Sequence, residues 1–215
     1  MTTSRMKAVA ATALSVVSLL AASGAQATLS YRLNNQAVYD SDANLTWLRD
    51  ANANAGNGLG GRMDWSTAMA WASNLVIEGV DDWRLPVGPI VGAGYNQTAS
   101  EMGNMFYTVL GGVAGDPITT THNNPTNYAF FQNVQSNDYW SGVEVDSNDA
   151  WVFGFGDGYQ LGDVKYVNLF AWAVRSGDVG GNPVPAPGTL ALLGAGLLGW
   201  AGVKRSRHRV GAVIG

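Results

Sequence analysis

The chain has 215 residues, which is room for one domain of ordinary size, and it contains no cysteine. The absence of cysteine excludes disulfides, thiol catalysis and cysteine-ligated metals. The segment from Thr28 to Asp178 holds all sixteen acidic residues but only six of the twelve basic ones, a formal net charge of −10. Such a charge repels polyanions, so nucleic acid is excluded as a partner.

Residues 1–27 are predicted to be a secretory signal peptide. Arg5 and Lys7 precede an apolar stretch over residues 8–22, and Ala25 and Ala27 form an A-x-A site. A basic start, a short apolar run and a small-residue site are typical of export signals. We therefore expect a signal peptidase to cut after Ala27, so that the exported domain covers residues 28–178.

Two short strands are predicted next, over residues 37–40 and 45–48, around the turn-rich sequence SDAN. The sequence DSDAN at 40–44 is similar to the start of an EF-hand calcium loop. Such a loop needs glycine at its sixth position and an acid at its twelfth, and these positions hold Leu45 and Ala51. A turn stabilised by aspartate side chains is therefore the preferred interpretation.

Capping residues and the spacing of apolar residues predict two helices. Thr98 and Glu101 in the sequence TASE fit a capping box for one helix, which Gly111 and Gly112 would end. Before it in the chain, Asp64 can cap a helix with an apolar face. That face holds Trp65, Ala68, Met69, Ala72 and Leu75.

The remaining elements are predicted to be strands and long loops. Residues 139–145 and 150–155 alternate around the polar sequence DSND, which predicts a hairpin, and a last strand is expected over 170–175. Long loops are expected at 51–62, 86–97 and 111–127. The predicted class is α+β, with two helices and a small, mainly antiparallel sheet.

The sequence DDWRLP at 81–86 is interpreted as structural. Trp83 and Leu85 alternate with charged positions in an extended segment that Pro86 ends. Arg84 can form a two-pronged ion pair with a nearby carboxylate and so fix this segment.

No residue set predicts a reaction. His122 is the one histidine between residues 28 and 178, no nucleophile elbow accompanies it, and no pair of carboxylates is singled out. The domain is therefore predicted not to be an enzyme, with glycoside hydrolysis by paired carboxylates as the alternative.

Calcium is an alternative ligand of the turn carboxylates Asp146, Asp149 and Asp157, because hard cations prefer oxygen. The lectin calcium motifs Glu-Pro-Asn and Trp-Asn-Asp are missing, however, and solvated turn carboxylates are common. No metal or other cofactor is therefore assigned.

Aromatic residues in segments rich in Asn and Asp favour carbohydrate as a ligand. A flat ring covers the apolar face of a sugar, while amides and carboxylates bond its hydroxyl groups. Trp47, Trp140 and Trp151 are expected to lie in the core. The predicted ligand-binding residues are the loop positions Tyr95, Tyr128 and Tyr159.

The last part of the chain is predicted to anchor it in a membrane. A linker over 179–187 precedes sixteen uncharged residues at 188–203, slightly short for a membrane helix. The tail at 204–215 carries a basic cluster that would stay in the cytoplasm. The cluster consists of Lys204, Arg205, Arg207 and Arg209.

The sequence VPAPGTLALLGAGLLGWAGVKRSRHR at 184–209 resembles a PEP-CTERM sorting signal. Such a signal joins a short Pro-Glu-Pro-type motif, one membrane helix and an Arg-rich end. The motif here is Val184-Pro185-Ala186-Pro187, with alanine where the most familiar version has glutamate. The resemblance implies processing by an exosortase-type membrane protease near the motif.

Several sequences also stand out between residues 36 and 178: VYDSDANLTWLRD, WSTAMAWASNLVIEGVDDWRLPV, SEMGNMF, NDYWSGVE, AWVFGFGDG and FAWAVRSGD. Together they resemble the Lcl C-terminal domain family. The resemblance implies a C-type-lectin-like fold related to formylglycine-generating enzymes. Ala72 and Ala173 stand where family members often carry cysteines, and the catalytic cysteines of the formylglycine enzymes are missing.

The function expected from these resemblances is that of an exported cell-envelope protein. Its domain would bind surface polysaccharide or exopolysaccharide without turnover. The alternatives are an envelope polysaccharide hydrolase and a purely structural matrix protein.

Overall fold

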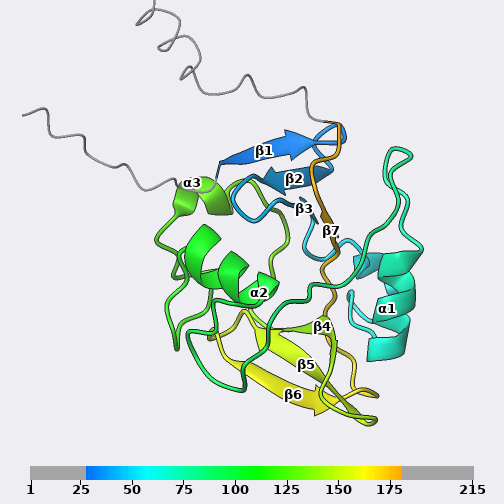
Figure 1. Cartoon of the computed structure of the whole chain (residues 1–215), viewed down its shortest axis with the longest axis vertical. Coiled ribbons are helices and arrows are strands. Elements are labelled where there is room, and N and C mark those ends of the chain that lie inside the picture. The colour runs from blue at the N-terminus through cyan, green and yellow to red at the C-terminus, as the bar shows by residue number, and fades with distance from the viewer. Residues whose placement is uncertain (1–27, 181–215) are drawn as a thin grey trace, which may run out of the picture.

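The computed structural model describes residues 28–180, which form two antiparallel sheets (Figure 1). The second sheet is a meander, and the first is completed by the last strand of the domain. This arrangement confirms the predicted α+β class. The first sheet has the order β1 (Leu29–Arg32), β2 (Ala37–Asp40), β3 (Leu45–Leu48) and β7 (Val174–Ser176), and the second has the order β4 (Asp138–Glu144), β5 (Asp149–Gly154) and β6 (Gln160–Val164).

The helices of the described part are short, and none is long and apolar enough to cross a membrane. They are the 3-10 helix η1 (Ala55–Asn57), α1 (Trp65–Ser73), α2 (Glu101–Gly103), the π-helix η2 (Asn104–Val109) and α3 (Pro125–Tyr128). The predicted membrane helix at 188–203 and the predicted signal peptide at 1–27 lie outside the described residues.

Helix α1 begins as predicted, because the Asp64 carboxylate accepts the backbone N–H of Thr67 at 2.9 Å. This interaction lowers the pKa of Asp64. The predicted apolar face is confirmed except at one residue. Ala68 and Ala72 are buried, and Trp65 and Leu75 are half-buried and pack against the core, whereas Met69 is 37% exposed.

The second predicted helix starts two residues later than expected. Ser100, and not Thr98, caps it by accepting the N–H of Gly103 at 3.1 Å. The helix then widens into η2, where the N–H of Leu110 donates to the carbonyl of Met105, five residues earlier. Gly111 ends it as predicted, with a φ of +73° that favours glycine.

The turn chemistry at Asp40 is confirmed. Its buried carboxylate accepts the N–H groups of Asp42 and Ala43, at 3.0 and 3.2 Å, and so closes the turn between β2 and β3. Burial raises the pKa of Asp40, although the two N–H groups oppose the shift. The predicted hairpin is also confirmed, as β4 and β5 with a turn at 145–148.

The last strand is shorter than the predicted 170–175, because residues 170–173 form hydrogen bonds with both sheets. The N–H of Trp140 in β4 donates to the carbonyl of Phe170, and the N–H of Leu48 in β3 donates to that of Ala173. Arg84 and Val174 exchange both backbone hydrogen bonds at 2.9 Å. This segment therefore connects the two sheets instead of continuing one of them.

Aromatic rings fill the space between the sheets. Trp172 packs edge to face against Trp47 at 5.1 Å, Phe131 at 5.3 Å and Phe155 at 5.8 Å. Its indole N–H donates to the carbonyl of Leu48 at 2.7 Å. Trp47 and Trp140 are buried as predicted, whereas Trp151 is only half-buried and so was wrongly placed in the core.

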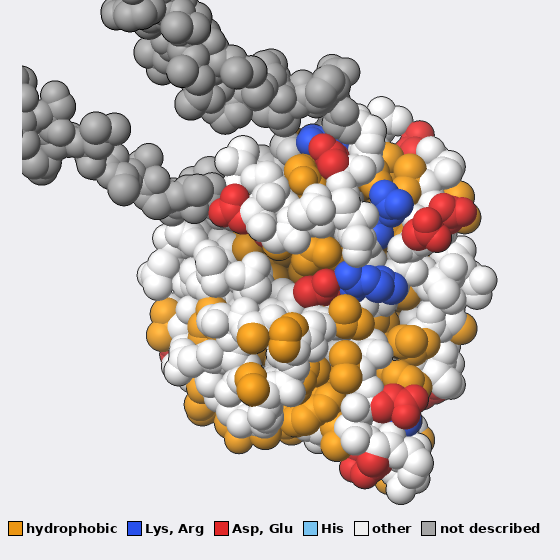
Figure 2. Space-filling model, in the orientation of Figure 1, with side chains coloured by type: hydrophobic (Ala, Val, Ile, Leu, Met, Phe, Trp, Pro, Cys, Tyr) orange, Lys and Arg blue, Asp and Glu red, His pale blue; other side chains and the backbone are white. Residues whose placement is uncertain are grey.

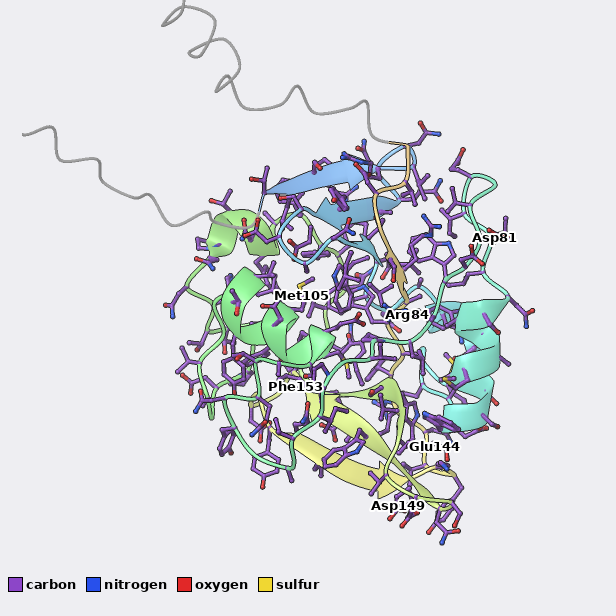
Figure 3. The ribbon with its side chains drawn as sticks, in the orientation of Figure 1. Asp81, Arg84, Met105, Glu144, Asp149 and Phe153 are labelled. Carbon is purple, nitrogen blue, oxygen red and sulfur yellow. The ribbon has the colours of Figure 1, made fainter. Side chains whose placement is uncertain are left out.

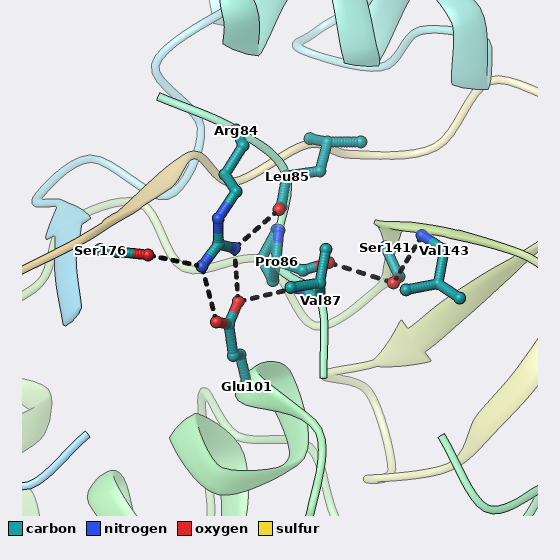
Figure 4. Close-up of polar contacts among 8 residues, drawn as sticks. All are labelled: Arg84, Leu85, Pro86, Val87, Glu101, Ser141, Val143 and Ser176. Carbon is teal, nitrogen blue, oxygen red and sulfur yellow. Dashed lines mark hydrogen bonds and ion pairs between the residues drawn. The ribbon is translucent and has the colours of Figure 1, made fainter. Parts of the chain in front are cut away.

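The DDWRLP segment holds the sheets and α2 together (Figure 4). Trp83 and Leu85 are buried, and the Arg84 guanidinium pairs with both oxygens of Glu101, at 2.7 and 2.8 Å. Glu101 also accepts the N–H of Val87 at 2.7 Å. The two-pronged ion pair predicted for Arg84 is confirmed. Its partner is Glu101, which was expected to complete the capping box of the second helix instead.

The end of the domain is fixed beside its beginning. Arg32 at the end of β1 pairs with Asp178, with 2.8 Å between Nη2 and Oδ2. This pairing lowers the pKa of Asp178 and raises that of Arg32. Val179 is buried at 4% exposure, so the packed residues extend one position beyond the boundary expected at 178.

Charge is dispersed over the described surface. On the face in Figure 2, most basic groups lie beside acidic ones, and hydrophobic side chains gather over the lower half. Four basic residues of the described part form ion pairs: Arg32, Arg84, Lys165 and Arg175. This face therefore offers no basic patch for a polyanion.

Candidate functional site

Two of the three predicted tyrosines lie side by side. The rings of Tyr95, in the loop before α2, and Tyr159, just before β6, meet edge to face with 4.8 Å between their centroids. Tyr95 is 44% exposed, and Tyr159 is half-buried. We call this pair, with the backbone that supports it, the tyrosine platform.

Backbone pairing holds the platform in place. Gly94 and Gln160 exchange hydrogen bonds of 2.9 and 3.0 Å, which join the loop to the first residue of β6. The side chain of Gln160 is buried and donates to the carbonyl of Gly92 at 2.9 Å. The loop at 92–97 is thus fixed to the sheet, although it has no regular structure of its own.

The π-helix supplies a third tyrosine that supports the platform from below. The hydroxyl of Tyr107 donates to the carbonyl of Gly158 at 2.7 Å and accepts the N–H of Asn96 at 3.0 Å. Burial raises the pKa of Tyr107, and the nearby Asp157 carboxylate adds to the shift, so the phenol stays protonated and can donate. Tyr107 therefore ties the loops that carry Tyr95 and Tyr159.

The widened turn of η2 explains how Tyr107 reaches this position. Its neighbour Phe106 points into the core, against Phe153 at 5.6 Å and Phe155 at 5.6 Å, while Tyr107 also contacts Phe153 at 6.2 Å. Figure 3 labels Phe153 on the sheet below this helix. One helical turn thus serves both the core and the platform.

The third predicted residue, Tyr128, lies elsewhere, in α3. Its ring stacks on His122 with 4.0 Å between centroids and 13° between planes, and burial raises the pKa of its hydroxyl. The Nδ1 of His122 lies 2.8 Å from the carbonyl of Ile118. This histidine is positioned by a backbone carbonyl rather than by a carboxylate, which is not the arrangement of a catalytic triad.

The three carboxylates predicted as an alternative calcium site are not brought together. Asp146 and Asp149 lie at the tip of the β4–β5 hairpin, where Figure 3 labels Asp149, and Asp157 follows the far end of β5. A six-residue strand spans about 20 Å. Among residues 28–180, no three His, Asp or Glu side chains are arranged to hold a metal ion.

Two of these carboxylates, Asp146 and Asp157, instead serve their own turns, whereas Oδ1 of Asp149 is buried and has no hydrogen-bond partner among the described residues. Asp146 accepts the N–H groups of Asn148 and Asp149, at 2.7 and 2.9 Å, which lowers its pKa. Asp157 accepts the N–H of Tyr159 at 2.9 Å and so shapes the turn beneath the platform. The turn interpretation of Asp146 and Asp157 fits their hydrogen bonds.

One pair of carboxylates does lie close to the platform. The Oδ1 atoms of Asp138 and Asp157 lie 3.0 and 2.9 Å from the point that a Cβ on Gly154 would occupy. Burial raises the pKa of Asp138, and the charges of Asp157 and Asp163 raise it further. Such an arrangement keeps a carboxyl group protonated to a higher pH than usual.

Tyr107 also lies in a segment rich in Asn, but it was not among the three predicted ligand-binding tyrosines, and its supporting position was not predicted. Its role depends on contacts with residues 51 positions later in the chain. A π-helical turn has no sequence signature as clear as a cap or a heptad, so no local pattern could have indicated it.

Comparison with known proteins concerns the last part of the chain. Residues 183–206 match the PEP-CTERM protein-sorting motif. The protein is thus exported and sorted through an exosortase. The match includes the four predicted motif residues and ends before Arg207 and Arg209, and all of it lies outside the described residues. No curated protein shows significant similarity to the chain.

Proposed function

We propose that the described domain is a non-enzymatic carbohydrate-binding domain, which the sorting motif delivers to the cell surface. The observation that carries the proposal is the tyrosine platform. It offers two adjacent rings, one of them 44% exposed, on loops that are fixed before any ligand binds. Fixed rings lose little conformational entropy on binding, and they suit the flat apolar faces of sugars.

We further propose that the domain is of the Lcl C-terminal type, with a C-type-lectin-like fold. The support is the set of sequences that resemble that family together with their roles in packing. In particular, the DDWRLP segment bridges sheet and helix, and Ala72 and Ala173 are both fully buried where relatives often carry cysteines. Small buried residues are what a lost disulfide would leave.

The binding proposal predicts that replacing both rings removes glycan binding. Double substitution Tyr95→Ala and Tyr159→Ala should lower the affinity for a bound surface glycan by at least about fivefold, since a stacked ring contributes about 0.5–1.5 kcal/mol and two are lost. The measurement is binding of the full chain to a glycan array followed by titration of the best ligand.

The matched control is Tyr166→Ala, because Tyr166 is 80% exposed but does not belong to the platform. Its affinity should equal that of the unaltered protein. Equal binding by the platform variant and the control would refute the platform as the binding site.

The pair of Asp138 and Asp157 favours a second candidate, hydrolysis of an envelope polysaccharide. Their Oδ1 atoms lie no more than about 6 Å apart, a limit that includes the separation of about 5–5.5 Å that retaining glycosidases use. Asp138, with its raised pKa, would be the acid. The test is release of sugar products from an envelope polysaccharide. If the unaltered protein releases them and Asp138→Asn does not, the function is hydrolysis rather than binding.

Processing gives a separate prediction. Protein recovered from the medium should begin at Thr28 and lack everything after about Pro187, because both ends are read by membrane proteases. Intact-mass analysis of the medium and membrane fractions measures this directly. Shed protein that still carries residues 190–209 would contradict the predicted processing.

A further inference from the structure

A cavity of about 270 Å³ lies on a part of the domain that the tyrosine platform does not share. It opens between the ends of β2 and β3 and the C-terminal half of α1. Pockets for drug-sized molecules measure roughly 300–1,000 Å³, so this cavity suits a single sugar unit rather than a longer chain.

The wall of the cavity contains one arginine, Arg49, and one carboxylate, Asp50, which form no ion pair with each other. Arg49 follows β3 directly, and among residues 28–180 no carboxylate forms an ion pair with it. Its Nε is buried and has no hydrogen-bond partner there, and its Nη1 lies 3.4 Å from the carbonyl of Asn35. Buried donors are nearly always paired, so this guanidinium retains unused capacity for a ligand.

The neighbouring acid is already occupied. Both oxygens of Asp50 accept hydrogen bonds, from the N–H of Asn52 at 2.8 Å and from the amide of Asn133 at 2.9 Å. Asp50 therefore does not neutralise Arg49 through direct contact. Each of its oxygens can still accept one further hydrogen bond from a hydroxyl group, because each oxygen has two acceptor positions.

The rest of the lining combines an aromatic ring with amides. Trp71 of α1 is half-buried and contributes a flat surface, which Leu75 and Ile77 extend. Gln36 and Gln132 also line the cavity, and the Gln36 amide donates to Glu78 at 2.6 Å. A ring, amides and a guanidinium match a sugar that has an apolar face, hydroxyl groups and a carboxylate.

The backbone around the cavity is fixed on both sides of Arg49. Its N–H donates to the carbonyl of Gln36 at 2.9 Å, and its carbonyl accepts the N–H of Gln132 at 2.8 Å. The guanidinium also lies 5.0 Å from the centroid of the Tyr31 ring, which limits its movement. The walls are therefore largely formed before a ligand enters.

We propose that this cavity binds one hexuronate residue, with the carboxylate on Arg49 and the sugar face on Trp71. Only an anionic sugar uses the guanidinium fully, since planar carboxylates match its paired donors. The net charge of −10 over residues 28–178 opposes long polyanions but leaves room for one carboxylate at a local cation. The cavity adds a second, charge-selective site to the proposed binding domain.

The test is calorimetric titration of the full chain, purified in a detergent without sugar headgroups. The ligands are glucuronate and galacturonate, each compared with the matching neutral hexose. We expect each uronate to bind at least about tenfold more tightly than its neutral counterpart. Trp71→Ala should weaken binding of both kinds of sugar.

Arg49→Gln should remove the preference for uronate, so that uronate and the matching neutral hexose bind with about equal affinity. The matched control is Arg62→Gln, because Arg62 lies over the ring of Phe170 and does not line the cavity. This control should keep the full preference. Thermal unfolding of each variant verifies that it is folded.

Equal affinity for uronate and neutral hexose, no binding of either, or a preference that survives Arg49→Gln would each overturn the proposal. The platform variant, with both Tyr95 and Tyr159 replaced, should still bind uronate in the cavity. The result for one site is therefore independent of the result for the other.

Discussion

Replacing Trp172 with alanine is expected to destabilise the domain by about 3–5 kcal/mol, the range typical of large aromatic residues removed from a core. The ring contacts Trp47, Phe131 and Phe155 and lies in the segment that joins the two sheets. Its loss leaves a cavity that both sheets would have to close. Urea unfolding followed by circular dichroism measures the change in the free energy of unfolding.

Two further variants separate the contribution of ring packing in the core from that of the indole hydrogen bond and of an exposed ring. Trp172→Phe keeps most of the packing but loses the indole hydrogen bond to Leu48, so it should cost clearly less than the alanine variant. Tyr166→Ala removes an aromatic ring that is 80% exposed and should change stability by less than about 0.5 kcal/mol. A loss below about 1 kcal/mol for Trp172→Ala would show that this ring does not hold the sheets together.

The second large effect is expected at Glu101. Its replacement by alanine should destabilise the domain by about 2–3 kcal/mol, because hydrogen bonds to charged groups contribute about 1.5–3 kcal/mol and the loss leaves Arg84 and the N–H of Val87 without their partner. Solvent reaches part of Arg84, whose side chain is 32% exposed, so the cost stays below that of a fully buried pair. The measurement is again urea unfolding.

Glu78→Ala is the matched control for this experiment. Glu78 also accepts two side-chain hydrogen bonds, from Asn34 and Gln36, but these lie on the exposed surface. Its loss should cost less than about 1 kcal/mol. If the two variants were equally stable, the Arg84–Glu101 pair would be an ordinary surface interaction rather than a support of the fold.

Features that depend on neighbouring residues were predicted well from the sequence. The cap at Asp64, the turn at Asp40 and the β4–β5 hairpin each follow from side chains within a few positions of one another. Hydrogen bonds of this kind join groups a few residues apart, so local patterns predict them wherever no distant partner competes.

Features that depend on distant partners were not predictable in the same way. Glu101 would complete a local capping box, but Arg84 competes for it and forms two hydrogen bonds. The strand at 170–175 is shortened because its residues pair with both sheets. In each case a tertiary contact outweighed the local preference.

The same distinction between local and distant contacts applies to the candidate sites. The composition of the loops indicated Tyr95 and Tyr159, yet their proximity follows from the pairing of Gly94 with Gln160. Tyr128 has the same kind of loop composition but packs against His122 instead. Arg49 and Trp71 were not predicted, because the cavity that they line is formed by separate segments of the chain, at 35–36, 48–53, 71–77 and 132.

The pairing of Arg32 with Asp178 places the end of the described chain beside β1, which would face the bilayer if the predicted membrane helix at 188–203 tethers the precursor. The chain leaves the described part at Gly180, beside β1, and the matched sorting motif begins only three residues later, a reach of about 10 Å. Sheet β4–β5–β6 lies at the opposite end of the domain in Figure 1. While the precursor awaits cleavage, we expect β1 to sit nearest the bilayer and the tip of the meander to point outward, toward the surroundings of the cell.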